Sequence, residues 1–251
     1  MALGITLTTL GGPTVLLELG GLRLLTDPTF DEPGEYPVGT RALRKTAPSA
    51  LSAAEVGRVD AVLLSHDQHA DNLDHGGREF LAGSPRTLST ASAAGRVDGV
   101  EALPNWATVD VGGVRVTGVP AQHGPDGTEH LVGEVTGFLL AGDGLPTVYV
   151  SGDNASLDVV ARVAEHAGRV DLAVLFAGAA RTPLVPDGPL TLTSEQAAEA
   201  ARLLEAPRVV VVHTDSWAHF TETIDDVRTA FDRAGLADRL HVPAHGTPLS
   251  L

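Results

Sequence analysis

The chain of 251 residues contains no cysteine, and this absence removes three kinds of chemistry at once. Disulfide bonds cannot form, thiolates cannot hold a metal ion, and a cysteine nucleophile is not available. Any metal site must therefore be built from nitrogen and oxygen ligands.

Basic residues are also few. The chain has 17 Lys and Arg against 32 Asp and Glu, a formal net charge of −15. Binding to a phosphate backbone needs clustered Lys and Arg, so we expect no nucleic-acid partner and, by the same argument, no attachment to an anionic membrane surface. No segment reaches the roughly 18 apolar residues of a membrane span, and residues 1–5 lack the basic region of a signal peptide. We therefore expect a cytoplasmic protein.

The organisation of the chain changes along its length. Hydrophobic residues make up 43% of the sequence, enough for a substantial core. Short apolar runs separated by glycine and proline predict strands in the first part, and the later part alternates strands with helices at 157–166, 193–204 and 224–234. Residues 29–50, rich in Pro and Gly, predict a long loop. Because no flexible linker divides the chain, we expect a layered α/β architecture in a single domain, 1–251.

Residues 62–74 are the most informative segment, because an apolar strand there ends in a loop rich in potential metal ligands. These are His66, Asp67, His69, Asp71 and Asp74. Side chains at alternate positions can converge where a chain leaves a strand irregularly, and imidazole with carboxylate suits zinc, manganese or iron. Polar loops are enriched in Asp and Asn for turn formation but not in paired His, which favours a metal site.

Further ligand-type residues follow four other strands: His123, Asp153, His213 and His245. Loops at strand ends are where such scaffolds present chemistry, so we expect these side chains to gather. We also expect His213 or His219 to donate a hydrogen bond to a developing oxyanion. Trp217 is either a pocket wall or a core residue.

The order of these residues resembles that of the metallo-β-lactamase-fold hydrolases, and within them the branch that includes ascorbate-6-phosphate lactonase-like proteins. The resemblance extends over essentially the whole chain and rests on residues 24–28 (Leu-Leu-Thr-Asp-Pro), 65–74, 121–123, 151–153 and 244–246. It implies a four-layer αββα sandwich with a metal site at one edge between the two sheets.

The resemblance also implies a ligand set. His69 and His123, with either His66 or Asp67, resemble the ligands of a first metal. Asp71 and His245 resemble those of a second, and Asp153 the carboxylate between the two. If Asp67 takes the first place, Asn72 falls where the family has a histidine, and one of the two metals is expected to bind more weakly. Zinc or manganese is expected, with iron as a further option, as one or two ions.

The implied activity is hydrolysis by a metal-bound hydroxide, with Asp71 either orienting the water or shuttling its proton. The expected substrate is a small-molecule lactone, ester, amide or phosphodiester, and a homo-oligomer is compatible with the sequence. The alternative is a non-catalytic small-molecule binding protein with a degenerate metal site. Among the charges in residues 29–50, Arg41, Arg44 and Lys45 either hold an anionic substrate or are solvated surface charge.

Overall fold

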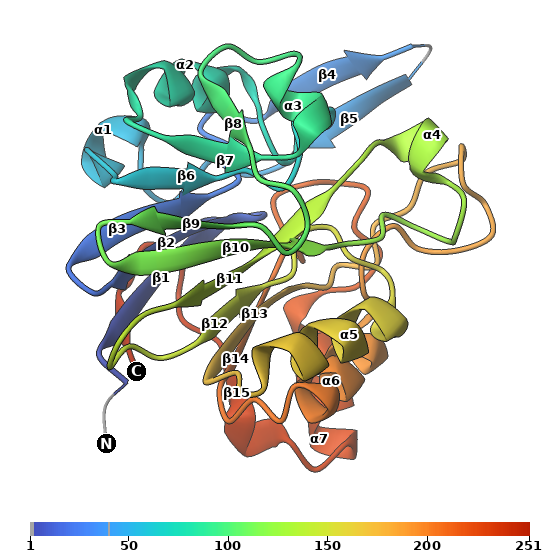
Figure 1. Cartoon of the computed structure of the whole chain (residues 1–251). Helices are drawn as coiled ribbons and strands as arrows, with labels where there is room; N and C mark the ends of the chain where they lie inside the picture. Colours follow the sequence, from blue (N-terminus) through green and yellow to red (C-terminus); the bar gives the residue numbers. More distant parts are fainter. Residues whose placement is uncertain (1–2, 40) are drawn as a thin grey trace.

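The structure is a computed structural model that describes residues 3–39 and 41–251, and two mixed β-sheets form its centre (Figure 1). The first sheet has the order β16 (Leu249–Ser250), β1 (Ile5–Gly11), β2 (Thr14–Leu19), β3 (Leu22–Thr26), β6 (Ala61–Leu63), β7 (Thr87–Ser89), β8 (Val100–Ala102). The second has the order β15 (Leu240–His241), β14 (Val209–Val212), β13 (Leu172–Phe176), β12 (Val148–Val150), β11 (Thr136–Ala141), β10 (Val114–Pro120), β9 (Thr108–Val111).

Helices cover the outer face of each sheet (Figure 1). Those beside the first sheet are α1 (Ala53–Val56), α2 (His75–Gly83) and α3 (Ala91–Ala94). Those beside the second are α5 (Leu157–Ala167), α6 (Ser194–Leu203) and α7 (Ile224–Arg233), with the short η1 (Ala237–Arg239) after them. The predicted helix at 193–204 begins with a capping box, which Thr193 and Gln196 form. The layers are therefore helix, sheet, sheet and helix, which agrees with the four-layer αββα sandwich that the family resemblance implies.

Alternating side chains explain why both sheets are covered on two faces. In β14, Val210 and Val212 face the core between the sheets, whereas Val209 and Val211 pack under the helices. The first sheet behaves in the same way, with Leu24 facing inward and Leu25 facing outward. Successive residues of a strand point to opposite faces, so a continuous apolar run is what a strand buried on both sides requires.

Residues 29–50 differ from the long loop that the sequence predicts. They contain a hairpin of β4 (Gly34–Val38) and β5 (Arg41–Lys45), which pairs only with itself among the described strands. At its root, Lys45 Nζ lies 2.9 Å from Asp74 Oδ2 with both side chains buried. Lys45 is therefore not surface charge, and Asp74 binds Lys45 and the backbone rather than a histidine.

The hairpin is one of three segments that project beyond the sheets at the same end of the molecule. The others are α4 (Glu129–Val132) and the segment around residues 181–190 (Figure 1). Trp217 packs at 3% exposure against Tyr36 of the hairpin, and thus belongs to the core rather than to a pocket wall. Within the described residues no helix is both long and apolar enough to cross a membrane.

Candidate metal centre

His66 follows β6 directly, and its hydrogen bonds fix which ring nitrogen is free. Its Nδ1 lies 3.0 Å from Ser65 Oγ, and that hydroxyl donates to Asp27 Oδ1 at 2.8 Å. Because the hydroxyl hydrogen is used on Asp27, His66 Nδ1 carries a proton and the Nε2 lone pair is available. Nε2 lies 3.1 Å from His69 Nδ1. The ring of His66 is thus set in the form that can bind a metal.

His123 reaches the same point from the second sheet, after β10. Its Nδ1 donates to the carbonyl oxygen of Leu190 at 2.9 Å, and its Nε2 lies 3.2 Å from His69 Nδ1. Potential ligand atoms of His66, His69 and His123 all lie within 4.8 Å of one another, and we call these residues the histidine group. Burial lowers the pKa of His66 well below its ordinary value and that of His123 to about 4. Both rings are therefore neutral, the form that binds metals.

Asp71, Asp153 and His213 form a second set, the carboxylate group, again with potential ligand atoms within 4.8 Å of one another. His213 Nε2 lies 3.3 Å from Asp71 Oδ2 and 3.8 Å from Asp153 Oδ1. Burial alone would lower the pKa of His213, but the charges of Asp153 and Asp71 hold it above its ordinary value. The same two carboxylates favour a bound cation.

Several buried atoms of the carboxylate group have no hydrogen-bond partner. They are Asp71 Oδ1, Asp153 Oδ2 and both ring nitrogens of His213. Each such atom costs about 1–3 kcal/mol, so several facing one another do not stabilise a fold by themselves. A bound cation would satisfy the carboxylate oxygens and one imidazole nitrogen together. The residues present therefore fit a divalent metal ion.

Asp153 belongs to the carboxylate group but also reaches the histidine group. Its Oδ2 is 3.9 Å from His123 Nε2, while its Oδ1 is 3.8 Å from His213 Nε2. The preceding Gly152 has a φ of 57°, and a Cβ there would lie 2.5 Å from the carbonyl oxygen of Thr136. Only glycine permits this close approach, which brings the carboxylate to both groups.

Asp67 and Asn72 lie outside both groups, although the sequence predicts them as ligands. Arg96 donates to the two carboxylate oxygens of Asp67, at 3.0 and 2.5 Å. Of the two alternatives for the first position, the structure thus brings in His66 and not Asp67. Asn72 donates from Nδ2 to Asp153 Oδ1 at 3.1 Å, so it supports a carboxylate instead of taking a ligand place.

His245 is also outside the site, and His213 occupies the place predicted for it. The ring nitrogens of His245 lie 2.9 Å from Thr9 Oγ1 and 2.9 Å from Asp215 Oδ2, and its side chain is 42% exposed. The order of strands explains the exchange. β14, which precedes His213, lies inside the second sheet near β12 and Asp153, whereas β15, which precedes His245, is at the sheet edge.

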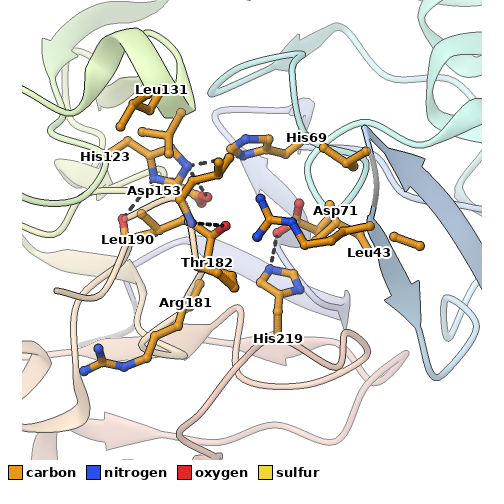
Figure 2. Close-up of a pocket in the computed structure, with 17 residues that line it drawn as sticks. Leu43, His69, Asp71, His123, Leu131, Asp153, Arg181, Thr182, Leu190 and His219 are labelled. Carbon is orange, nitrogen blue, oxygen red and sulfur yellow. Dashed lines mark hydrogen bonds and ion pairs between the residues drawn. The ribbon is translucent and has the colours of Figure 1, made fainter. Parts of the chain in front are cut away.

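A cavity of about 160 Å³ opens over the two groups (Figure 2). Its lining includes His69, Asp71, His123 and Asp153. His219, a predicted catalytic residue, also lines it and is 3.0 Å from Asp71 Oδ2 through Nε2. Burial alone would raise the pKa of Asp71, but the charge and hydrogen bond of His219 and the charge of nearby His213 hold it well below its ordinary value. A carboxylate anion with an imidazole beside it therefore faces the cavity.

A family model described as the beta-lactamase superfamily domain matches residues 22–214, which include every residue of both groups. The chain belongs to the beta-lactamase superfamily. Its metallo-β-lactamase fold and its His and Asp groups agree with this membership, and the residues that carried the resemblance in the sequence lie largely within the matched range.

Similar proteins support the same family. A metal-dependent hydrolase of Pyrococcus abyssi is 27% identical over 164 residues, which cover 63% of this chain and 68% of that protein. A metal-dependent hydrolase of Anaeromyxobacter dehalogenans is 26% identical over 238 residues, covering 86% and 76%. The isothiocyanate hydrolase of Delia radicum gut bacteria superposes with a TM-score of 0.83 at 21% identity, over 98% of this chain and 99% of that one, and so shares the fold.

Some supporting groups escape prediction from the sequence. The carbonyl of Leu190 gives no signal, because any residue supplies one and its position depends on the folded loop. Asp27 does give a signal, since it directly follows β3, the strand that pairs with β6. It accepts hydrogen bonds from the Ser65 backbone and hydroxyl, and burial raises its pKa well above the ordinary value.

Proposed function

We propose that this metal-dependent hydrolase binds two divalent metal ions, one at each group, and cleaves a small-molecule lactone, ester, amide or phosphodiester. One observation carries the proposal: residues of both groups line the cavity, and Asp153 of the carboxylate group lies within 3.9 Å of His123 in the histidine group. The predicted ascorbate-6-phosphate lactonase branch, the cytoplasmic location and a homo-oligomer stay predictions.

The two groups differ in the metal they favour. Three imidazoles, as in the histidine group, are a typical zinc ligand set. Two carboxylates with one imidazole, as in the carboxylate group, are harder ligands and suit manganese or iron as well as zinc. We therefore propose zinc at the histidine group and a broader preference at the carboxylate group.

The chain's own residues then have separable roles. Divalent metals, when bound, lower the pKa of water and polarise the bond to be cleaved. Asp71 and Asp153 place negative charge where it orients the attacking water, and Asn72 holds the Asp153 carboxylate in position. His219 lines the cavity outside both ligand groups, so we assign it the transfer of a proton to the leaving group.

The non-catalytic alternative loses the observation behind it. A degenerate site would lack an imidazole ligand, as when Asn72 stands where the family has a histidine. His66 and His213 are available as imidazole ligands, so each group has three potential ligands. No feature of the described residues favours a degenerate site over a complete one.

Metal analysis combined with a substrate panel tests the proposal. We expect protein purified without chelator to carry close to two metal ions per chain, and the double variant His69→Ala, His123→Ala to lose the metal of the histidine group. His245→Ala is the matched control, because it removes an imidazole outside both groups. The panel contains lactones, esters, amides and phosphodiesters. Full metal content in the double variant, or no turnover of any panel member by the two-metal protein, would contradict the proposal.

A further inference from the structure

The cavity over the two groups has an apolar mouth. Val38, Leu131 and Leu184 line it and are 46%, 45% and 48% exposed. They come from three separate segments: the hairpin, α4 and the segment after β13. A single exposed apolar side chain is ordinary on a protein surface, but three around one opening indicate contact with an apolar ligand.

Two arginines, Arg41 and Arg181, line the same cavity. Within residues 3–39 and 41–251, neither guanidinium forms an ion pair, whereas the acidic chain pairs nine of its other basic residues with carboxylates. Lys45, at the root of the hairpin, is occupied by Asp74. The cavity thus has cationic groups in reach whose charge is not used in holding the fold.

Arg41 and Arg181 are not equivalent. Figure 2 shows the Arg181 side chain turned away from His69 and Asp71. Arg41 is the first residue of β5 and pairs across the hairpin with Val38, one of the apolar residues at the mouth. An arginine and an apolar side chain therefore stand together on the segment that overhangs the site.

Long-range electrostatics add a reason for a local cation. A chain with a net charge of −15 repels anionic molecules at a distance. An anionic substrate is therefore held only if a nearby positive group outweighs that field at short range. A guanidinium does so best, because it offers a fork of N–H donors to a carboxylate or similar anion.

We propose that the substrate combines an apolar body with an anionic group, and that Arg41 binds the anionic group while Val38, Leu131 and Leu184 contact the body. The inference rests on the proposed function for where the cleaved bond lies. The space of about 160 Å³ limits the body to a small one, since an apolar cavity of roughly 150 Å³ holds a benzene molecule.

Binding of two simple probes to the metal-loaded protein tests this without any turnover. Hexane-1-sulfonate carries the charge and an apolar chain but is a poor metal ligand, and hexan-1-ol carries a chain of the same length without the charge. We expect wild type to bind the sulfonate about 10- to 100-fold more tightly, as measured by isothermal titration calorimetry. Arg41→Gln should abolish that preference. Arg44→Gln removes the same charge from the same strand, outside the cavity lining, and should keep it.

A second variant, Leu131→Ala, tests the apolar contact. Leu131→Ala should weaken both probes by a similar factor, because the chain contact is common to them, whereas Arg41→Gln should weaken only the sulfonate. Equal binding of the two probes to wild type, or an unchanged preference in Arg41→Gln, would overturn the inference. Hydrolysis of neutral esters in that case would leave the proposed function intact. Conversely, the expected effects of the two variants on probe binding, found in a protein without hydrolytic activity, would support the inference and contradict the proposed function.

Discussion

The histidine group and the carboxylate group lie beside each other, yet their side chains are made ready for a metal ion in different ways. In the histidine group, the second ring nitrogens of His66 and His123 are engaged by Ser65 and by the carbonyl of Leu190, and burial lowers the pKa of these two rings and keeps them neutral. In the carboxylate group, ligand atoms remain without partners, and the charges attract a cation. The first group is preorganised in shape and the second in charge, so we expect different metal affinities and different sensitivity to mutation.

Substitution of Asp153 should have the largest effect on turnover and metal content, because this side chain lies within reach of both groups. Asp153→Asn keeps the shape and removes the charge, so we expect turnover to fall by about 10²- to 10³-fold or more, with metal lost from the carboxylate group. Metal content by mass spectrometry and turnover of the best panel substrate are the measurements. Near-normal turnover with two metals bound would show that Asp153 contributes position only.

His213→Ala sharpens the comparison by removing a ligand from one group alone. We expect one metal ion per chain to remain, held by the histidine group, and the other to bind more weakly by more than the roughly 10- to 100-fold that an outer partner contributes. His245→Ala should leave both ions in place. If instead His245→Ala loses a metal and His213→Ala does not, the ligand assignment based on geometry is wrong.

Asn72→Ala tests whether Asn72 holds the Asp153 carboxylate in position rather than binding a metal ion itself. The variant removes the hydrogen bond to Asp153 Oδ1, so affinity at the carboxylate group should fall by about 10- to 100-fold while the histidine group keeps its metal. Competition with a chelator of known affinity measures the two sites separately. Asn72→His should not add metal, because His213 already supplies the imidazole; a gain in occupancy would contradict this.

His245 gives the smallest effect, on stability rather than on metal. The hydrogen bond to Asp215 raises the pKa of His245. The stabilisation is complete below the ordinary histidine value of about 6.5 and is lost as the pH rises through the raised value. Burial alone would raise the pKa of Asp215, but the same hydrogen bond lowers it, so that contribution disappears as the pH falls below about 4.

Because the pair is partly exposed, its contribution to the free energy of unfolding is below about 1 kcal/mol. Urea unfolding of wild type and His245→Gln at several pH values measures it. The two curves should differ most between about pH 4 and 6.5 and converge above the raised His245 pKa. A constant difference at alkaline pH would mean that the imidazole acts through packing alone.

The sequence predicts much of the site because strand-end loops bring ligands to one edge. His69, Asp71, His123 and Asp153 follow apolar runs that the structure contains as strands or as the loop after β6. The choice between His66 and Asp67 depends on where Arg96 lies, 29 residues away from Asp67, and no local pattern gives that. The exchange of His245 for His213 depends on strand order across the sheet, which spacing along the chain does not contain.

The strands of the two sheets are predictable from local sequence patterns, whereas the hairpin of β4 and β5 is not. Continuous apolar runs such as β13 and β14 are visible in the sequence because both faces of these strands are buried. The hairpin, β4 and β5, is mostly exposed and carries Pro37, so its residues resemble a loop. Its conformation is stabilised at the root by Lys45 and Asp74, a contact between distant parts of the chain.

Each ligand group draws side chains from both sheets: His66, His69 and Asp71 follow β6 of the first, and His123, Asp153 and His213 follow strands of the second. A metal ion in either group is therefore a cross-link between the two halves of the sandwich. By mass action, an ion that binds only the folded chain adds RT ln(1 + [M]/Kd) to its stability, about 2.7 kcal/mol at a hundredfold excess over Kd. The melting temperature should thus report free metal concentration, and the supply of metal in its surroundings would govern how long this protein survives as well as how fast it reacts.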